Sequence, residues 1–176
     1  MYSHRGDFLR HLAQTSPAPM GLEVVAARGV RLKDVQGRWL YDLIGGISVC
    51  SLGHGHPAIH KAIKNQLRKF SHVMVYGEMV QGPQVLFAKK LSEFLPSPLD
   101  CVYFVNSGTE ATEAAMKLAK RATGRPKIAA FHEAYHGSSQ GALSLMGSEY
   151  FRGAYRPLLP GITTLHYEQK ESLQQI

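Results

Sequence analysis

The stretch CVYFVNSGTEATEAAMKLAKRATGRPKIAAF, residues 101–131, decides the fold class. Its first five residues, 101–105, are continuously apolar, which is typical of a strand buried on both faces of a sheet. The segment that follows repeats apolar residues at helical spacing and stops at Gly124, a common residue at helix C-termini. A second apolar run fills residues 127–131. This pattern predicts two parallel strands joined by a right-handed helical crossover.

The same alternation continues toward the C-terminus. We expect a short helix over residues 140–146, a third buried strand over 162–167 and the start of another helix over 171–176. Strands that alternate with helices in this way indicate an α/β fold with a mostly parallel sheet between helical layers. Three strands and an unfinished helix make an incomplete sheet, so we expect the chain to stop within the fold.

The N-terminal third has a different pattern. Residues 1–20 are polar and end in Ser-Pro-Ala-Pro, which favours an extended arm. Three short β-type runs follow, separated by turn residues such as those at 34–37. They predict a small antiparallel meander with strands over residues 22–25, 30–33 and 39–43.

Two amphipathic helices are expected between the meander and the decisive stretch. The first begins at Pro57 and covers residues 57–70, and the second covers residues 83–95, where Pro96 stops it. We therefore divide the chain into two parts. Residues 1–55 form an arm and a small-domain meander, and residues 56–176 form the first part of a larger α/β domain.

Composition and charge exclude several classes of protein. With 176 residues, 44% hydrophobic and 19% charged, the chain is globular rather than disordered. The net charge is +7, but the basic residues are scattered over polar helix faces, so no nucleic-acid interface is predicted. No apolar run is long enough for a membrane span, and no signal peptide is evident. Two cysteines, Cys50 and Cys101, make no disulfide framework, which favours the reducing cytoplasm.

The turn after the first apolar run is the strongest candidate site. It reads Asn-Ser-Gly-Thr-Glu over residues 106–110 and leads directly into the predicted helix. Free N–H groups and the dipole of a helix N-terminus attract anions, and Ser107 and Thr109 add hydroxyl groups suited to a phosphate. Ser107 and Glu110 also have the spacing of a capping box, so a purely structural role is equally consistent with the spacing.

The second candidate follows the second apolar run and reads His-Glu-Ala-Tyr-His-Gly over residues 132–137. Taken literally it is the H-E-x-x-H signature of zinc proteases, which requires both histidines on one face of a helix. The motif directly follows a predicted strand and leaves no room for a helix to start. The alternative places this loop beside residues 107–109, because the carboxyl ends of parallel strands meet at one edge of a sheet. Tyr135 would then offer its ring to a planar ligand.

A third motif, Gly-His-Gly-His-Pro-Ala over residues 53–58, satisfies the loose G-x-G-x-x-A pattern of dinucleotide sites. Pro57 and two histidines occupy positions where a pyrophosphate would approach the backbone. No strand with an acidic ribose ligand follows it. A structural start of the helix is the better interpretation.

Four segments occur in the order in which class III aminotransferases carry them: Leu52-Gly-His-Gly-His-Pro57, Asn106-Ser-Gly-Thr-Glu-Ala111, the alanine-rich MKLAKRATGR after it, and Tyr135-His-Gly137. The chain resembles this family from about Gly21 to Gly161. Its members are pyridoxal phosphate (PLP) enzymes of the aspartate-aminotransferase fold, such as acetylornithine, ornithine and 4-aminobutyrate aminotransferases. The resemblance implies the N-terminal part of that fold, with a small antiparallel meander, helices and the first strands of an α/β/α sheet.

The resemblance also implies roles for individual residues. Ser107, Gly108 and Thr109 would hold the phosphate of the cofactor. Tyr135 would stack on the pyridine ring, and His136 would support that wall of the site.

A substrate pocket and subunit contact are implied around Ile47, Val49 and Tyr76. For Tyr76, simple packing of an apolar segment explains the sequence equally well.

The groups that perform PLP chemistry are expected outside this chain. They are a lysine for the Schiff base and an acid beside the pyridine nitrogen. In the family both lie downstream of the matched part, and no lysine of this sequence has a comparable setting. We assign no catalytic residue within residues 1–176 and do not expect the chain alone to catalyse transamination.

Three hypotheses follow. The first is a cytoplasmic homodimeric aminotransferase that moves an amino group from an amine or amino-acid donor to a 2-oxo acid, with PLP as cofactor and no metal. The second is a truncated, non-catalytic module that binds phosphate or PLP. The third is a zinc hydrolase that uses His132, Glu133 and His136.

Overall fold

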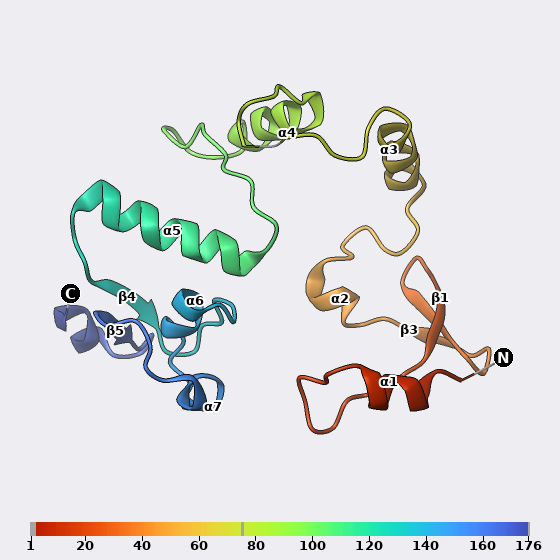
Figure 1. Cartoon of the computed structure of the whole chain (residues 1–176), viewed down its shortest axis with the longest axis horizontal. Helices are drawn as coiled ribbons and strands as arrows, with labels where there is room; N and C mark the ends of the chain where they lie inside the picture. The colour runs from red at the N-terminus through yellow and green to blue at the C-terminus, as the bar shows by residue number, and fades with distance from the viewer. Residues whose placement is uncertain (1–2, 75, 176) are drawn as a thin grey trace. The chain divides into compact units, whose positions relative to one another are not determined.

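A computed structural model describes residues 3–74 and 76–175 of the chain. Contacts divide it into two compact units, Met1–Val80 and Gln81–Ile176, and each is described by itself (Figure 1). The predicted division between residues 55 and 56 concerns the domains of the whole protein and stays a prediction. Within the described residues, no helix combines the length and the apolar character that crossing a membrane requires.

The first unit contains the predicted antiparallel meander. Its strands are β1 (Val24–Arg28), β2 (Arg31–Asp34) and β3 (Trp39–Tyr41), in the order β1-β2-β3. Leu32 pairs with Ala27 on one side and with Leu40 on the other. The prediction of a meander is confirmed, with strand ends displaced by at most three residues.

A buried carboxylate holds the turn between β2 and β3. Asp34 is 3% exposed and accepts bonds from the Arg38 backbone N–H at 2.8 Å and from Arg38 Nε at 2.7 Å. Burial alone raises the pKa of Asp34, but the bonds from Arg38 outweigh it and the pKa lies below its ordinary value.

Along the chain, helices precede and follow the meander. The first, α1, runs over Arg5–His11, so the expectation of an extended arm over residues 1–20 is wrong there. Asp7 in its first turn and Arg10 and His11 in its last turn complement the helix dipole, which explains a helix in this polar segment. After the single turn α2 (Gly45–Ser48), α3 spans Pro57–Leu67 and begins at the predicted proline.

The second unit contains a parallel pair of strands with helices between and before them. After α4 (Gly82–Ser92), its elements are α5 (Gly108–Thr123), β4 (Ile128–Phe131), α6 (Gln140–Ser144), α7 (Glu149–Arg152), the 3₁₀ turns Gly153–Tyr155 and Lys170–Gln175, and β5 (Ile162–Leu165). Ile128 pairs with Ile162 and Phe131 with Leu165. The predicted parallel pairing of these two strands is confirmed.

A small core joins α5 to the strands. Met116 of α5, Ala130 of β4 and Leu145, which ends α6, are each at most 7% exposed, and Ile128 and Ile162 pack against them. In Figure 1, β4, β5 and α6 all lie on the same side of α5. Four of the five residues of α6 are buried, and Gln140 is exposed. The core therefore fixes α5 against the two strands and the end of α6.

Two predicted elements differ in the structure. Residues 101–105 form no strand, and Tyr103 and Phe104 are 81% and 40% exposed. A strand exists only where its N–H and C=O groups find a ladder, and within the described residues β4 and β5 pair only with each other. The C-terminal segment, expected to begin an α-helix, forms the 3₁₀ turn Lys170–Gln175.

Candidate functional site

The N-terminus of α5 carries a variant of the capping box, in which Glu110 reaches the residue before the N-cap. Ser107 is the N-cap, and its Oγ accepts the N–H of Glu110 at 3.3 Å. The Glu110 carboxylate turns back and accepts the N–H of Asn106 at 2.6 Å. At the other end Gly124 takes a left-handed conformation with φ 69° and closes the helix. A capping box serves only part of the first turn, so the N–H groups of Gly108 and Thr109 still point out of the helix end.

The loop after β4 is bonded to the first turn of α5. Thr109 Oγ1 lies 2.6 Å from Ser139 Oγ and accepts the Ser139 N–H at 3.3 Å. Thr112 Oγ1 donates to the carbonyl of His136 at 3.0 Å. Gly137, with φ 119°, lies so close that an added Cβ would stand 2.9 Å from Thr109 Cα. The structure thus brings Thr109 and the loop containing His136 together, as the sequence predicts.

Glu113 is the centre of this connection. Its Oε1 accepts hydrogen bonds from the Ser139 hydroxyl at 2.6 Å and from the N–H groups of Gly141 and Ala142 at 2.9 and 3.0 Å. The Ser139 bond is the main reason that the pKa of Glu113 lies below its ordinary value, and burial opposes it. Glu113 therefore caps the start of α6 from a neighbouring helix.

Each hydroxyl group of this network has a single proton, which determines which group donates in each hydrogen bond. Ser139 has one hydroxyl proton, and a carboxylate only accepts, so that proton lies on the bond to Glu113. In the contact between Thr109 and Ser139 the donor is then Thr109. At the turn, Ser107 keeps a hydroxyl proton for an external acceptor, whereas Thr109 can offer its backbone N–H.

Tyr135 and His136 sit on the same loop in different environments. Tyr135 is 68% exposed; its hydroxyl lies 3.1 Å from Ser138 Oγ and its ring meets Phe151 edge-on at 6.5 Å. His136 has its Nε2 buried, with no hydrogen-bond partner among the described residues. A buried polar atom without a partner is costly, so this nitrogen is available to a ligand.

The H-E-x-x-H segment does not form the helix that zinc binding would require. His132 and Glu133 lie in a turn after β4, and residues 134–137 are irregular. The His132 ring stacks on His166 at 4.9 Å. In the described part of the chain, no three His, Cys, Asp or Glu side chains gather in a group able to hold a metal ion.

The residues implied for a substrate pocket all belong to the first unit. Ile47, Val49 and Tyr76 are 86%, 80% and 88% exposed. The Gly-His-Gly-His-Pro-Ala segment starts α3 at Pro57, in agreement with its structural interpretation.

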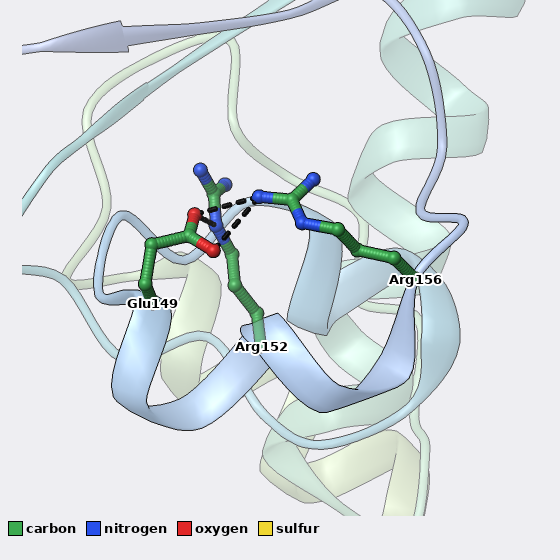
Figure 2. A network of polar contacts seen from close by, with 3 residues as sticks. All are labelled: Glu149, Arg152 and Arg156. Carbon is green, nitrogen blue, oxygen red and sulfur yellow. Dashed lines mark hydrogen bonds and ion pairs between the residues drawn. The ribbon is translucent and has the colours of Figure 1, made fainter.

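Several polar residues were not predicted. Glu113 and Ser139 are 26 positions apart, and no local spacing relates them. Figure 2 shows another network, in which the Glu149 carboxylate accepts Arg152 Nε at 2.7 Å and Arg156 Nη2 at 2.7 and 2.8 Å. The bonds from Arg156 and then Arg152 hold the pKa of Glu149 below its ordinary value. This network fastens α7 to the segment after it.

Comparison with known proteins gives a consistent match. The model of the family described as aminotransferase class III matches residues 12–175. An acetylornithine aminotransferase of Methanopyrus kandleri is 37% identical over 167 residues, which cover 94% of this chain and 41% of that protein. A [LysW]-aminoadipate semialdehyde/glutamate semialdehyde transaminase of Sulfolobus acidocaldarius is 36% identical over 156 residues, with 89% and 40% covered.

Solved structures agree on the fold. An (S)-enantioselective omega-transaminase from Thermomicrobium roseum matches with a TM-score of 0.82 at 29% identity, over 92% of this chain and 38% of that one. A transaminase from the marine bacterium Virgibacillus matches with a TM-score of 0.86 at 20% identity, over 97% and 43%. The chain spans about two-fifths of the length of the curated relatives that it matches.

Proposed function

Because this chain belongs to the class III aminotransferases, we propose that the protein transfers an amino group from an amine or amino-acid donor to a 2-oxo acid, with PLP as its cofactor. Donors of the acetylornithine, ornithine or 4-aminobutyrate type are the best candidates, since relatives named acetylornithine aminotransferase share up to 37% identity. We propose a cytoplasmic homodimer, as the family resemblance and the two free cysteines suggest. The proposal concerns the whole protein, and it expects the Schiff-base lysine and the pyridine-nitrogen acid outside residues 1–176.

The observation that carries this proposal is the open end of α5. Apart from its chain neighbours and the backbone of its own helix, no atom of the described residues lies within 4 Å of the position where a Cβ of Gly108 would stand, so a phosphate can approach its backbone. The N–H groups of Gly108 and Thr109 belong to the first turn of α5, where they have no partner within the helix, and Ser107 adds a hydroxyl beside them. The N-terminus of this 16-residue helix also favours negative charge. These residues fit a phosphate monoester.

The neighbouring loop fits the remainder of such a cofactor. The exposed ring of Tyr135 offers an apolar face, and the buried Nε2 of His136 offers a polar atom that no described residue satisfies. When bound, PLP supplies an electron-withdrawing ring that stabilises negative charge beside the amine. The part of this chain is to bind the phosphate, orient the ring and exclude water from one of its faces.

A matched pair of glycine variants of the full-length protein tests the phosphate site. Gly108 and Gly82 both begin helices, and both have open space at the Cβ position. We expect Gly108→Val to raise the PLP dissociation constant about tenfold or more, because the added methyl groups fill the space for the phosphate. Gly82→Val should leave PLP binding unchanged. The measurement is a PLP titration followed by absorbance, with inorganic phosphate as competitor.

An unchanged PLP affinity in Gly108→Val would remove the phosphate assignment. Activity is measured separately, as conversion of 2-oxoglutarate to glutamate with acetylornithine, ornithine or 4-aminobutyrate as donor. Tight PLP binding with no turnover of any of these donors would favour the non-catalytic binding module over the aminotransferase.

A further inference from the structure

The turn α2 in the first unit has an unusual backbone. Gly45, Gly46, Ile47 and Ser48 have φ values of 56°, 63°, 59° and 65°, so four consecutive residues are left-handed. L-residues other than glycine avoid this region, and a β-branched residue such as Ile47 avoids it most strongly. Such a conformation persists only where its surroundings hold it.

Asp42 holds the beginning of this turn. Its Oδ1 accepts the N–H of Ile44 at 3.1 Å and that of Gly45 at 2.8 Å. Its Oδ2 lies 2.7 Å from Nε2 of His54. The side chains of Asp42 and His54 are only 9% and 21% exposed. The His54 bond is the main reason that the pKa of Asp42 lies below its ordinary value, so the carboxylate is ionised and Nε2 of His54 carries the donated proton.

His54 is itself fixed to the meander. Its N–H donates to the carbonyl of Gly29 at 2.8 Å, and its carbonyl accepts the Gly29 N–H at 2.9 Å. Gly29 lies in the turn between β1 and β2. Gly53, just before His54, packs tightly on the hairpin, since an added Cβ would stand 3.0 Å from the Gly29 carbonyl oxygen. The hairpin thus fixes the backbone of His54, and the His54 imidazole in turn holds Asp42.

The turn presents apolar side chains to the outside of its unit. Ile47 and Val49 are 86% and 80% exposed. Neither the left-handed backbone nor the exposure of these two β-branched side chains stabilises the unit itself. An observed backbone outlier of this kind indicates a functional constraint.

We propose that His54 is a positioning residue which, through Asp42, keeps the turn Gly45–Ser48 left-handed so that Ile47 and Val49 contact the apolar part of the amino donor. This rests on the proposed function for the identity of the ligand. The role of His54 in holding the turn is supported by the contacts of His54 and Asp42 alone.

The test compares His54→Leu with His54→Gln in the full-length protein. Leucine removes the donor, whereas the glutamine amide nitrogen can take the place of Nε2. We expect backbone amide hydrogen exchange across residues 42–50 to rise about tenfold in His54→Leu and to stay near wild type in His54→Gln. His60→Leu, a change at an exposed histidine of α3, is the matched control. If His54→Leu does not fold, Asp42→Asn carries the same measurement with a side chain of equal size.

Kinetics test the role toward the donor. We expect His54→Leu to raise KM for the amino donor about tenfold, with kcat within a factor of about two and PLP affinity unchanged, because uniform binding is lost. Unchanged exchange in His54→Leu would overturn the proposal. Faster exchange with an unchanged donor KM would overturn the role toward the donor. If exchange is faster in His54→Leu but the wild-type protein has no transaminase activity, the proposed function is refuted while the positioning of the turn is supported.

Discussion

Gly137→Ala is expected to destabilise the full-length protein by about 2–4 kcal/mol and to weaken PLP binding. Gly137 has φ 119°, where L-residues are strained, and its Cβ would collide with the side chain of Thr109 and stand 2.9 Å from Thr109 Cα. Because backbone cannot yield as a flexible side chain does, the loop must move away from α5. Tyr135 and His136 would move with it. Chemical denaturation and PLP titration of the same samples measure both effects.

Gly124→Ala separates conformational strain from the collision. Gly124 also has a positive φ, 69°, but nothing lies within 4 Å of its Cβ position. We expect a loss of about 1 kcal/mol there and no change in PLP affinity. A Gly137→Ala protein no less stable than Gly124→Ala would contradict the close packing of the loop on Thr109.

Glu113→Ala is expected to cost about 2–5 kcal/mol, because it leaves the buried N–H groups of Gly141 and Ala142 and the Ser139 hydroxyl without their acceptor. Gly141 also packs directly on this carboxylate, with a Cβ position 2.7 Å from Glu113 Cδ. Glu133→Ala, at an exposed glutamate of the same unit, should change stability little. Denaturant unfolding of both variants measures the difference, and equal stabilities would show that Glu113 does not hold α6.

The same carboxylate predicts the sign of a pH effect. Its pKa in the folded protein lies below the ordinary value of 4.5. Its stabilising contribution is therefore complete above pH 4.5 and is lost as the pH falls through the lower, folded pKa. Glu113→Gln, which cannot ionise, should lose less stability than wild type over that acidic interval. Parallel pH curves for the two proteins would mean that Glu113 does not contribute to the acid response.

Local signals predicted α5 well, because both of its ends are determined within the segment. Ser107 begins it and Gly124 ends it. The apolar run over residues 101–105 wrongly predicted a strand, because the formation of a strand depends on residues outside the segment. Hydrophobicity indicates that a segment is suited to burial, but a strand also needs a backbone partner, and its identity is not encoded within those five residues.

The candidate site was predictable in part. The turn at 107–109 and the loop around His136 each have a recognisable local motif, and their proximity followed from the expected sheet. In the structure, side-chain bonds between Thr109 and Ser139 make that contact. Glu113 could not be foreseen, because its partners come from a segment 26 to 29 positions away. Likewise nothing near Asp42 indicates that a histidine twelve residues later completes its bonds.

The cap that Glu113 places on α6 has a consequence for the order of folding. A helix of five residues is far too short to persist by itself in water. Helix α5, with 16 residues and caps at both ends, has local determinants of its own. We therefore expect α6 to form only after α5, so that the crossover between β4 and β5 closes late. Substitutions confined to α6 should accelerate unfolding and leave the rate of folding almost unchanged.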